Sequence, residues 1–323
     1  MIDSGTGLLT DAESAIAEAA GRCSNAGRWG ADDVHGTLNF LTPEARVRAA
    51  ALVRRGVTFS LAQSFDEHGP QKGWRRRTNP VHTMTDTGTD AERGVQGFPH
   101  GIGGADDVVS MPLQCSTQWD GLGHIFDHGM AYNGRRAGDV VTSAGDAVTG
   151  IETAAALIAG RGVLLDVGRA VGGGELPDGF AITPEHLDAT AAAHGVTVER
   201  GDIVCVRTGQ LARTRRDGWG DYAGGPAPGL SFTCAQWLHG REIAAIATDT
   251  WGFEVRPNEF PDAFQPLHQV VIPHMGLYIG EMWDLDALAA DCATEGGYAF
   301  FLTAAPIPFT GAVGAPVNPI AVK

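Results

Sequence analysis

Four short apolar runs, separated by segments with helix-forming patterns, place the strongest limit on how this chain can fold. The runs cover residues 162–167, 202–207, 243–248 and 299–302. Each is short and rich in Val, Ile, Leu, Ala or Phe, which is typical of strands buried on both faces. Alternation of such strands with helices predicts an α/β layer architecture.

Helix start signals recur along the chain, before and between these runs. Thr42-Pro43-Glu44 and Thr183-Pro184-Glu185 each place Thr at the N-cap and Pro at the first helical position, and predict helices that extend to about residues 55 and 195. Further helices are expected over 10–21, from 231 to 240, and over 284–292. The stretch from 64 to 104 is rich in Gly, Pro, Asp, Thr and Arg, and its weak periodicity predicts a long ordered loop.

Composition excludes several classes of protein. A net charge of −15 with scattered basic residues is unfavourable for binding nucleic acid. The five cysteines include no CxxC pair, so neither a disulfide framework nor a thiolate zinc site is indicated. Free thiols, the lack of a secretory signal pattern and the lack of a long apolar run predict a cytoplasmic protein that does not bind a membrane.

The densest group of polar side chains lies between residues 114 and 128. Gln114, Gln118 and Asp120 are separated by even steps, which would place them on one face of an extended strand. Gly121 and Gly123 leave room for a bend that returns His124 to the same place. Asp and His are suitable ligands for zinc or manganese, and a structural hydrogen-bond network is an equally good interpretation of the spacing alone.

A second polar group, between residues 266 and 281, contains His268 and Glu281. They could supply a metal ligand and a general base, or they could lie at the ends of two helices or strands on the surface without a role in chemistry. Several aromatic residues could line a pocket, whereas Trp119 alternates with its polar neighbours and is expected in the core. These pocket candidates are Trp74, Phe126, Trp251 and Trp283. The loop residues Arg75, Arg76, Arg77 and His82 could close over an anionic substrate or form a solvated basic turn.

Taken together, these two groups resemble the cyclase family, which includes bacterial kynurenine formamidases and isatin hydrolases. The family motif is His-x-Gly-Thr-His-x-Asp-x-Pro-x-His, in which Ser116-Thr117, Asp120 and His124 match the Gly-Thr pair, the Asp and the last His. His268 and Glu281 match a second family element. Further matches lie at 201–209, 228–230, 249–250 and 305–319, so the resemblance covers about residues 30–321.

The resemblance carries expectations about fold and assembly. It implies an α/β fold, with a mixed sheet curled into a partly open barrel and helices on its periphery. Residues 30–323 would form the catalytic domain, preceded by an N-terminal helical segment over residues 1–29. Family members act on small molecules, and a homodimer or homotetramer is expected.

The departure from the family motif is as informative as the match. Gln114 and Gln118 stand where the family has metal-binding histidines, so the chain is more similar to a Gln-Trp-Asp branch. Because a carboxamide oxygen is a feeble ligand, any metal should be a single, weakly held zinc or manganese ion. Its expected ligands are Asp120, His268 and Glu281.

Two mechanisms are consistent with these residues. In the first, a bound metal activates water, His124 shuttles the proton, and an amide, lactam, lactone or ester bond opens. In the second, no metal is bound, and Asp120, His124 and Glu281 carry out acid–base cyclisation, dehydration or isomerisation with Gln118 as donor to an oxyanion. The residues expected to bind substrate are Gln114, Gln118, Trp74, Arg77 and Phe126. A binding protein without catalysis is a third interpretation.

Overall fold

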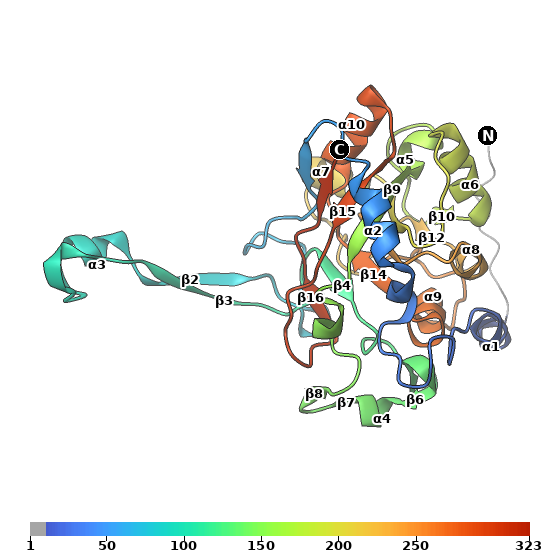
Figure 1. Ribbon diagram of the computed structural model, residues 1–323, viewed down its shortest axis with the longest axis horizontal. Coiled ribbons are helices and arrows are strands. Elements are labelled where there is room, and N and C mark those ends of the chain that lie inside the picture. Colours follow the sequence, from blue (N-terminus) through green and yellow to red (C-terminus); the bar gives the residue numbers. More distant parts are fainter. Residues whose placement is uncertain (1–10) are drawn as a thin grey trace.

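A nine-stranded mixed sheet forms the centre of the molecule in the computed structural model, which describes residues 11–323. The sheet is curled into a partly open barrel with helices around it, as the resemblance implied (Figure 1). In spatial order its strands are β1 (Thr58–Ser60), β17 (Ile320–Val322), β15 (Ala299–Thr303), β9 (Ala159–Asp166), β11 (Ile203–Arg207), β13 (Ala245–Thr248), β14 (Tyr278–Glu281), β4 (Gln118–Asp120) and β16 (Gly314–Pro316).

Four neighbouring strands of this sheet run parallel: β9, β11, β13 and β14. Three of them, β9, β11 and β13, are the apolar runs predicted at 162–167, 202–207 and 243–248, and β15 is the predicted run at 299–302. Alternate residues of each strand point to opposite faces. Val204 of β11 therefore lies in one hydrophobic core while Cys205 lies in the other.

The helices also agree with the sequence signals in most places. The α-helices are α1 (Ala12–Arg22), α2 (Pro43–Ala50), α3 (Gly88–Glu92), α4 (Ala137–Val140), α5 (Val167–Ala170), α6 (Pro184–Ala193), α7 (Gln210–Asp217), α8 (Cys234–Gly240), α9 (Pro266–Val270) and α10 (Asp286–Glu295). One detail was wrong: α2 ends five residues before the expected position at 55. Asp11 caps α1 by accepting a hydrogen bond from Ser14 N.

The N-terminal helix belongs to the main body of the protein. Ile16 and Ala19 of α1 lie in the same core as residues of α8 and α9, and α1 packs directly on both helices. The division at residue 29 into a helical segment and a catalytic domain stays a prediction.

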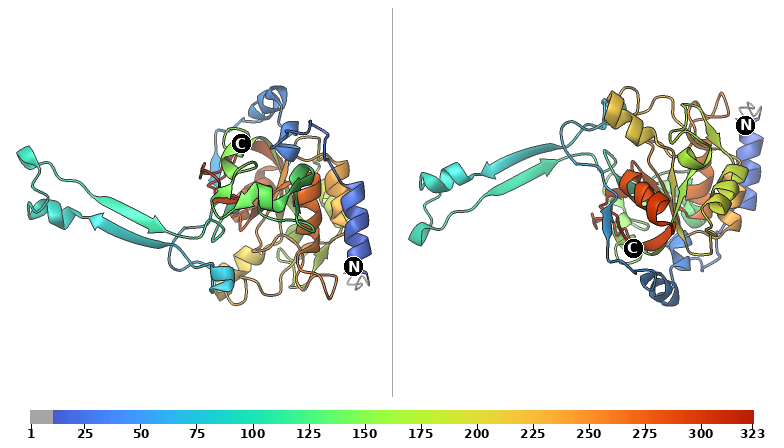
Figure 2. Two further views of the ribbon diagram at one scale, coloured as in Figure 1. Left: turned by 90° about the horizontal axis from the view of Figure 1, so that it is seen from below. Right: turned by 90° about the horizontal axis from the view of Figure 1, so that it is seen from above.

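The region expected to be a long loop contains an extended arm. Strands β2 (Val81–Asp86) and β3 (Asp106–Ser110) pair antiparallel, and α3 lies beyond them at the tip. Figures 1 and 2 show that this arm, residues 81–110, projects far from the body. The periodicity was weak because both faces of the ribbon are exposed, so no apolar face alternates with a polar one.

The remaining strands form short two-stranded pairs. They are β5 (Met130–Ala131) with β6 (Arg135–Arg136), β7 (Val141–Thr142) with β8 (Gly145–Asp146), and β10 (Ala181–Ile182) with β12 (Gly229–Leu230). The first two pairs follow the turn after β4 and lie below the sheet in Figure 1.

Candidate active site

Two adjacent strands bring the polar residues of both sequence clusters to one face of the sheet. In the antiparallel pair β4–β14, Gln118 lies opposite Glu281, and Asp120 lies opposite Ile279. The even spacing along each strand puts Gln118, Asp120 and Glu281 on the same side. All three side chains are buried, with relative exposures of 0%, 1% and 3%.

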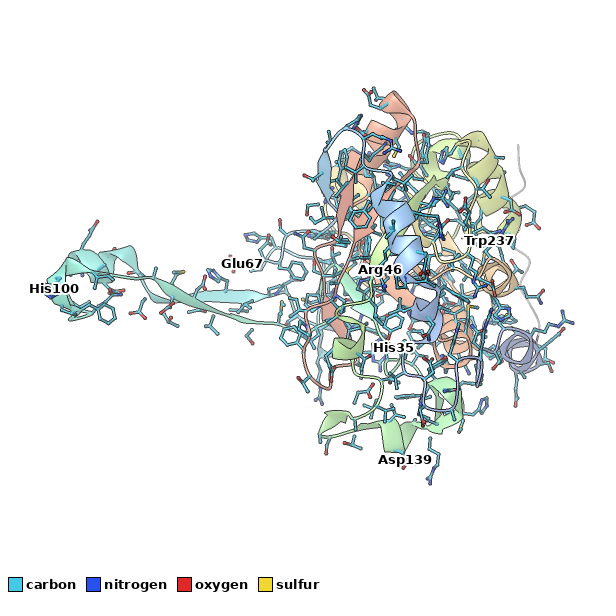
Figure 3. All side chains as sticks on the ribbon, viewed as in Figure 1. His35, Arg46, Glu67, His100, Asp139 and Trp237 are labelled. Atoms are coloured by element: carbon cyan, nitrogen blue, oxygen red, sulfur yellow. The ribbon has the colours of Figure 1, made fainter. Side chains whose placement is uncertain are left out.

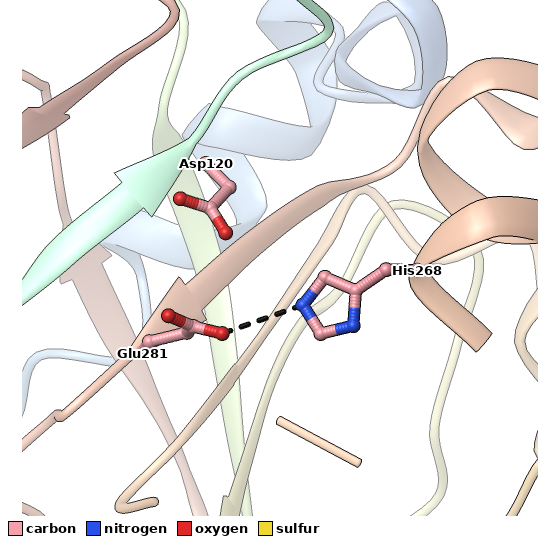
Figure 4. A group of neighbouring side chains, drawn as sticks. All are labelled: Asp120, His268 and Glu281. Carbon is pink, nitrogen blue, oxygen red and sulfur yellow. Dashed lines mark hydrogen bonds and ion pairs between the residues drawn. The ribbon is translucent and has the colours of Figure 1, made fainter. Parts of the chain in front are cut away.

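The second cluster contributes His268 from α9. Pro266 occupies the first turn of this helix, and the His268 ring points toward the end of β14 (Figure 4). His268 Nε2 lies 3.3 Å from Glu281 Oε1. One ligand atom from each of Asp120, His268 and Glu281 lies within 4.8 Å of the others. Residues about 150 positions apart in the sequence therefore converge.

Glu254 completes this buried group, and the sequence analysis did not identify it. Its carboxylate accepts hydrogen bonds from the backbone N–H groups of Leu267 and His268 at 3.1 and 3.0 Å. It also lies 2.6 Å from His268 Nδ1. Such a contact fixes the ring orientation and leaves Nε2 directed at Glu281. No spacing rule links Glu254 to His268; the only available signal was a Glu shortly after a buried strand.

His124 reaches the cluster through a tight turn after β4. His124 N donates to Gly121 O at 3.1 Å, and His124 Nε2 lies 3.8 Å from Asp120 Oδ2. A Cβ at Gly123 would overlap the Asp146 carboxylate, and one at Gly121 would lie 3.0 Å from Val313 O. A side chain at either position would push these neighbours aside, so glycine at both lets the turn pack closely against them.

The pKa values of the two histidines, His124 and His268, are shifted in opposite directions. Burial lowers the pKa of His124, and the nearby Asp120 charge only partly offsets this, so His124 is neutral near pH 7. Burial also disfavours the charged form of His268, but its bonds to Glu254 and Glu281 outweigh that and raise its pKa. Burial, with the Asp120 charge, raises the pKa of Glu281. The site thus holds a neutral base, His124, beside a buried pocket in which carboxyl groups face one cationic imidazole, His268.

Aromatic and basic side chains form the rim of the site. Trp74 packs edge-to-face on Trp251 at 5.2 Å between ring centroids, and Phe264 lies 5.8 Å from Trp74. The Arg77 guanidinium lies 5.4 Å from the Trp251 ring, and the Arg256 guanidinium lies 5.9 Å from it. Arg77 is close enough to lower the pKa of both His124 and Glu281. The rim therefore combines flat apolar surface with positive charge.

The fold and the sequence together identify the family. The Cyclase family model matches residues 46–255, which is more than half of the chain. The chain belongs to the cyclase family. A crystal structure of a novel cyclase is 41% identical, covers 93% of this chain and 100% of its own, and has a TM-score of 0.86. None of the curated proteins is similar in sequence to this chain.

More distant cyclase-family structures share the fold. Isatin hydrolase A from Labrenzia aggregata is 20% identical, with a TM-score of 0.58 over 84% of this chain and 94% of its own. Isatin hydrolase A from Ralstonia solanacearum is 18% identical, with a TM-score of 0.60 over 87% of this chain and 96% of its own. A protein described as a potential metal-dependent hydrolase with cyclase activity has 15% identity and a TM-score of 0.50, over 82% of this chain and 98% of its own. These structures share the fold of the chain, and membership of the cyclase family indicates that the chain is an enzyme.

The buried cluster suits a divalent metal ion by its chemistry. Two carboxylates and an imidazole are ligands that zinc and manganese accept. Asp120, Glu254 and Glu281 bring three acidic groups together with one cationic histidine, and such buried charge needs compensation. Gln118 Oε1 is also buried beside them and accepts no hydrogen bond from residues 11–323. Asp120, His268 and Glu281 are thus a possible metal site, as the sequence predicted.

Other predicted site residues are placed differently. Gln114 lies in a turn before β4, not on the strand, and its amide packs beside Gly314 of β16. The even spacing failed there because the extended conformation begins only at Gln118. Phe126 is half-buried two residues after His124 and belongs to none of the aromatic pairs among the described residues. His82 is on the exposed arm, paired with Asp107.

The tryptophans divide between the core and the rim. Trp119 is buried on the other face of β4 and packs edge-to-face on Trp283 at 4.9 Å, which confirms its expected core position. Trp283 was considered for the pocket, and that was wrong because its ring lies in the same core. Trp74 and Trp251 remain at the site.

No helix among residues 11–323 combines the length and the apolar character that crossing a bilayer requires.

Proposed function

We propose that this protein is a hydrolase that opens an amide, lactam, lactone or ester bond in a small molecule. The observation that supports this is the position of His124, a neutral imidazole beside Asp120 at the edge of a buried carboxylate–histidine cluster. Its side chain is 13% exposed, so one edge can meet a substrate while the ring stays oriented. A positioned neutral imidazole is suited to accept a proton at pH 7.

Asp120, His268 and Glu281 would hold the metal ion, and the ion would supply an acidified water and polarise the substrate carbonyl. The chain's own residues orient the ligands and transfer the proton. Glu254 holds the His268 ring with Nε2 facing the cluster. His124 Nε2 accepts the proton released by the attacking water and then protonates the leaving nitrogen or oxygen.

The rim suggests a flat, electron-rich substrate. Trp74, which is 38% exposed and packs edge-to-face on the buried Trp251, offers a ring for stacking, and Arg77 can donate to a carbonyl or carboxylate between Trp74 and His124. Phe126 and Gln114 are further candidates for substrate contacts. The shared fold of the isatin hydrolases is consistent with a small cyclic substrate, but the rim residues of this chain are the reason for the proposal.

A metal-free enzyme is the second candidate, and one contact favours it. Gln118 Nε2 donates to both Asp120 Oδ1 and Glu281 Oε2, each at 3.1 Å. The amide thereby partly compensates the two carboxylates without any cation. In this arrangement Asp120, His124 and Glu281 would exchange protons with a carbonyl substrate in cyclisation, dehydration or isomerisation.

Chelation separates the two candidates. Purified protein would be assayed against small esters, lactones, lactams and N-formyl amides, before and after dialysis against a chelator, and after zinc or manganese is restored. Hydrolysis that disappears on chelation and returns with metal supports the proposal. Full hydrolysis by chelated protein contradicts the role of the metal, and a lack of hydrolysis with or without metal contradicts the hydrolase and favours the metal-free cyclase, dehydratase or isomerase. His124→Ala serves as the control, because it should bind metal normally and still fail to turn over substrate.

A further inference from the structure

Two arginines at the rim of the active site have no acidic partner among residues 11–323. Arg77 is half-buried, and its guanidinium makes neither a hydrogen bond nor an ion pair with any of those residues. Arg256 is also half-buried: its Nη2 donates to Gly224 O at 2.7 Å, and its Nη1 is buried with no hydrogen-bond partner in that part of the chain. By comparison, the guanidinium of Arg207 is paired with two aspartates. Because a charge that is partly withdrawn from water needs compensation, the two rim arginines are suited to meet an anionic ligand.

Aromatic rings surround both guanidinium groups. The Arg77 guanidinium lies 5.8 Å from the centroid of the Trp74 ring and 5.4 Å from that of Trp251. The Arg256 guanidinium lies 5.9 Å from the centroid of Trp251 and 5.7 Å from that of Phe264. Since the rings of Trp74 and Phe264 are themselves 5.8 Å apart, the five side chains form one continuous group, which we call the collar. Its exposed rings, Trp74 and Phe264, are open to a flat ligand.

The turn at residues 73–77 fixes the position of Arg77 within the collar. Gly73 N donates to Arg77 O at 3.0 Å, and Arg77 N donates to Trp74 O at 2.9 Å, so the turn is closed on itself. Arg75 and Arg76 both have positive φ, 48° and 64°, which is a strained conformation for residues with a side chain. Strained backbone of this kind is concentrated at active sites and ligand clamps.

The collar lies beside the reacting groups. Burial lowers the pKa of His124, and the Arg77 charge lowers it further, which requires the guanidinium to lie near the imidazole. Burial raises the pKa of Glu281, and the Arg77 charge opposes that shift. Burial lowers the pKa of the Arg256 guanidinium, and the charges of Glu254 and Glu281 only partly offset this. An anion held by the collar would therefore lie next to His124, and the nearby carboxyl groups favour a singly charged anion over a phosphate dianion.

We propose that the collar binds the carboxylate of a planar aromatic substrate. Arg77 and Arg256 hold the carboxylate, and the substrate ring packs on Trp74 and Phe264. A guanidinium offers paired N–H donors to a carboxylate, and aromatic rings pack favourably on one another. The substrate class is thus aromatic acids that carry, in addition to this carboxylate, the bond to be opened. This inference deepens the proposed function and rests on it, since only the reaction makes the bound acid a substrate.

The first test compares two probes of the same shape, naphthoate and naphthamide, by isothermal titration calorimetry. The full chain is titrated as purified and again after chelation. Naphthoate should bind roughly tenfold to hundredfold more tightly than the neutral amide in both preparations, the effect of a charge-assisted hydrogen bond. Equal affinity for the two probes would overturn the inference. A preference that disappears on chelation would also overturn it, because the acid would then be bound by the metal.

The second test locates the carboxylate. Arg77→Met and Arg256→Met remove one charge each and keep an unbranched side chain, and each should reduce the preference for naphthoate roughly tenfold or more. Arg77→Met should fold normally because its guanidinium supports no hydrogen bond, so this variant decides the matter if Arg256→Met is unstable. A preference that survives in Arg77→Met would overturn the assignment, and tighter binding of naphthyl phosphate than of naphthoate would overturn the choice of a carboxylate.

Two further arginines provide matched controls. Arg76 is exposed in the same turn as Arg77 and contacts no ring of the collar, so Arg76→Met should keep the preference. Arg93 follows α3 at the far end of the arm, where Figure 3 places His100 away from the body, and Arg93→Met should also keep it. An equal loss in these controls would overturn the inference in favour of a general effect of charge.

These binding measurements separate the inference from the proposed function, because they require no turnover. A preference for naphthoate that depends on Arg77, in a protein that hydrolyses nothing, supports the collar and contradicts the hydrolase. Hydrolysis by a protein that binds naphthoate and naphthamide equally supports the hydrolase and contradicts the collar.

Discussion

Replacing Glu254 with Gln should destabilise the protein and loosen its metal site together. The carboxylate accepts from two backbone N–H groups and lies 2.6 Å from His268 Nδ1. A carboxamide has one acceptor oxygen, and its NH₂ group would face one of these donors instead of pairing with it. One buried donor left unpaired costs about 1–3 kcal/mol, and the two remaining bonds lose their charge assistance. We expect the free energy of unfolding to fall by about 2–4 kcal/mol.

The effect on metal should exceed that of a general loss of stability. With Nδ1 no longer held by a carboxylate, the His268 ring can turn away from Glu281. Loss of such an outer partner lowers metal affinity by about 10- to 100-fold. The assays are urea denaturation of the chelated protein and zinc titration against a chromophoric chelator at a temperature where both proteins are folded.

Glu259→Gln is the matched control for this prediction. Its carboxylate accepts from Ser231 Oγ at 2.9 Å and Phe232 N at 2.6 Å, and it does not contact His268. It should lower stability without changing zinc affinity. The reasoning about Glu254 is refuted if zinc affinity is unchanged in Glu254→Gln, or if Glu259→Gln reduces it equally.

Four further predictions follow from the site and the core. His124→Ala should lower turnover by about 10² or more while the fold survives, and near-normal turnover would remove His124 from the mechanism. The wild-type rate should fall as pH drops through the pKa of His124, which burial holds below its ordinary 6.5, because protonated imidazole cannot accept a proton; a rate that does not follow the His124 titration measured by NMR would count against this role. Gln118→His should raise zinc or manganese affinity in a direct titration, because imidazole is the stronger ligand, whereas Gln114→His, in the turn before β4 and not on the strand, should raise it less. Trp119→Ala should cost about 3–5 kcal/mol in denaturation, because it removes a fully buried ring from the contact with Trp283.

Local signals determined much of the fold. The apolar runs at 162–167 and 202–207 are strands because burial on both faces leaves an unmistakable pattern in the sequence. The Thr-Pro-Glu signal placed the start of α6 correctly, since capping depends only on neighbouring residues. The positions of Asp120, His124, His268 and Glu281 in one site were also predictable, but from ordered matches to a family motif and not from spacing.

Tertiary structure decided what local patterns do not contain. Gln114 and Gln118 look equivalent in sequence, yet only Gln118 is on β4, because pairing with β14 and β16 begins there. Glu254 enters the site through bonds to residues 13 and 14 positions away, which no period of a helix or strand encodes. The arm escaped prediction because neither of its faces is buried within its own chain, so burial left no periodic pattern in its sequence.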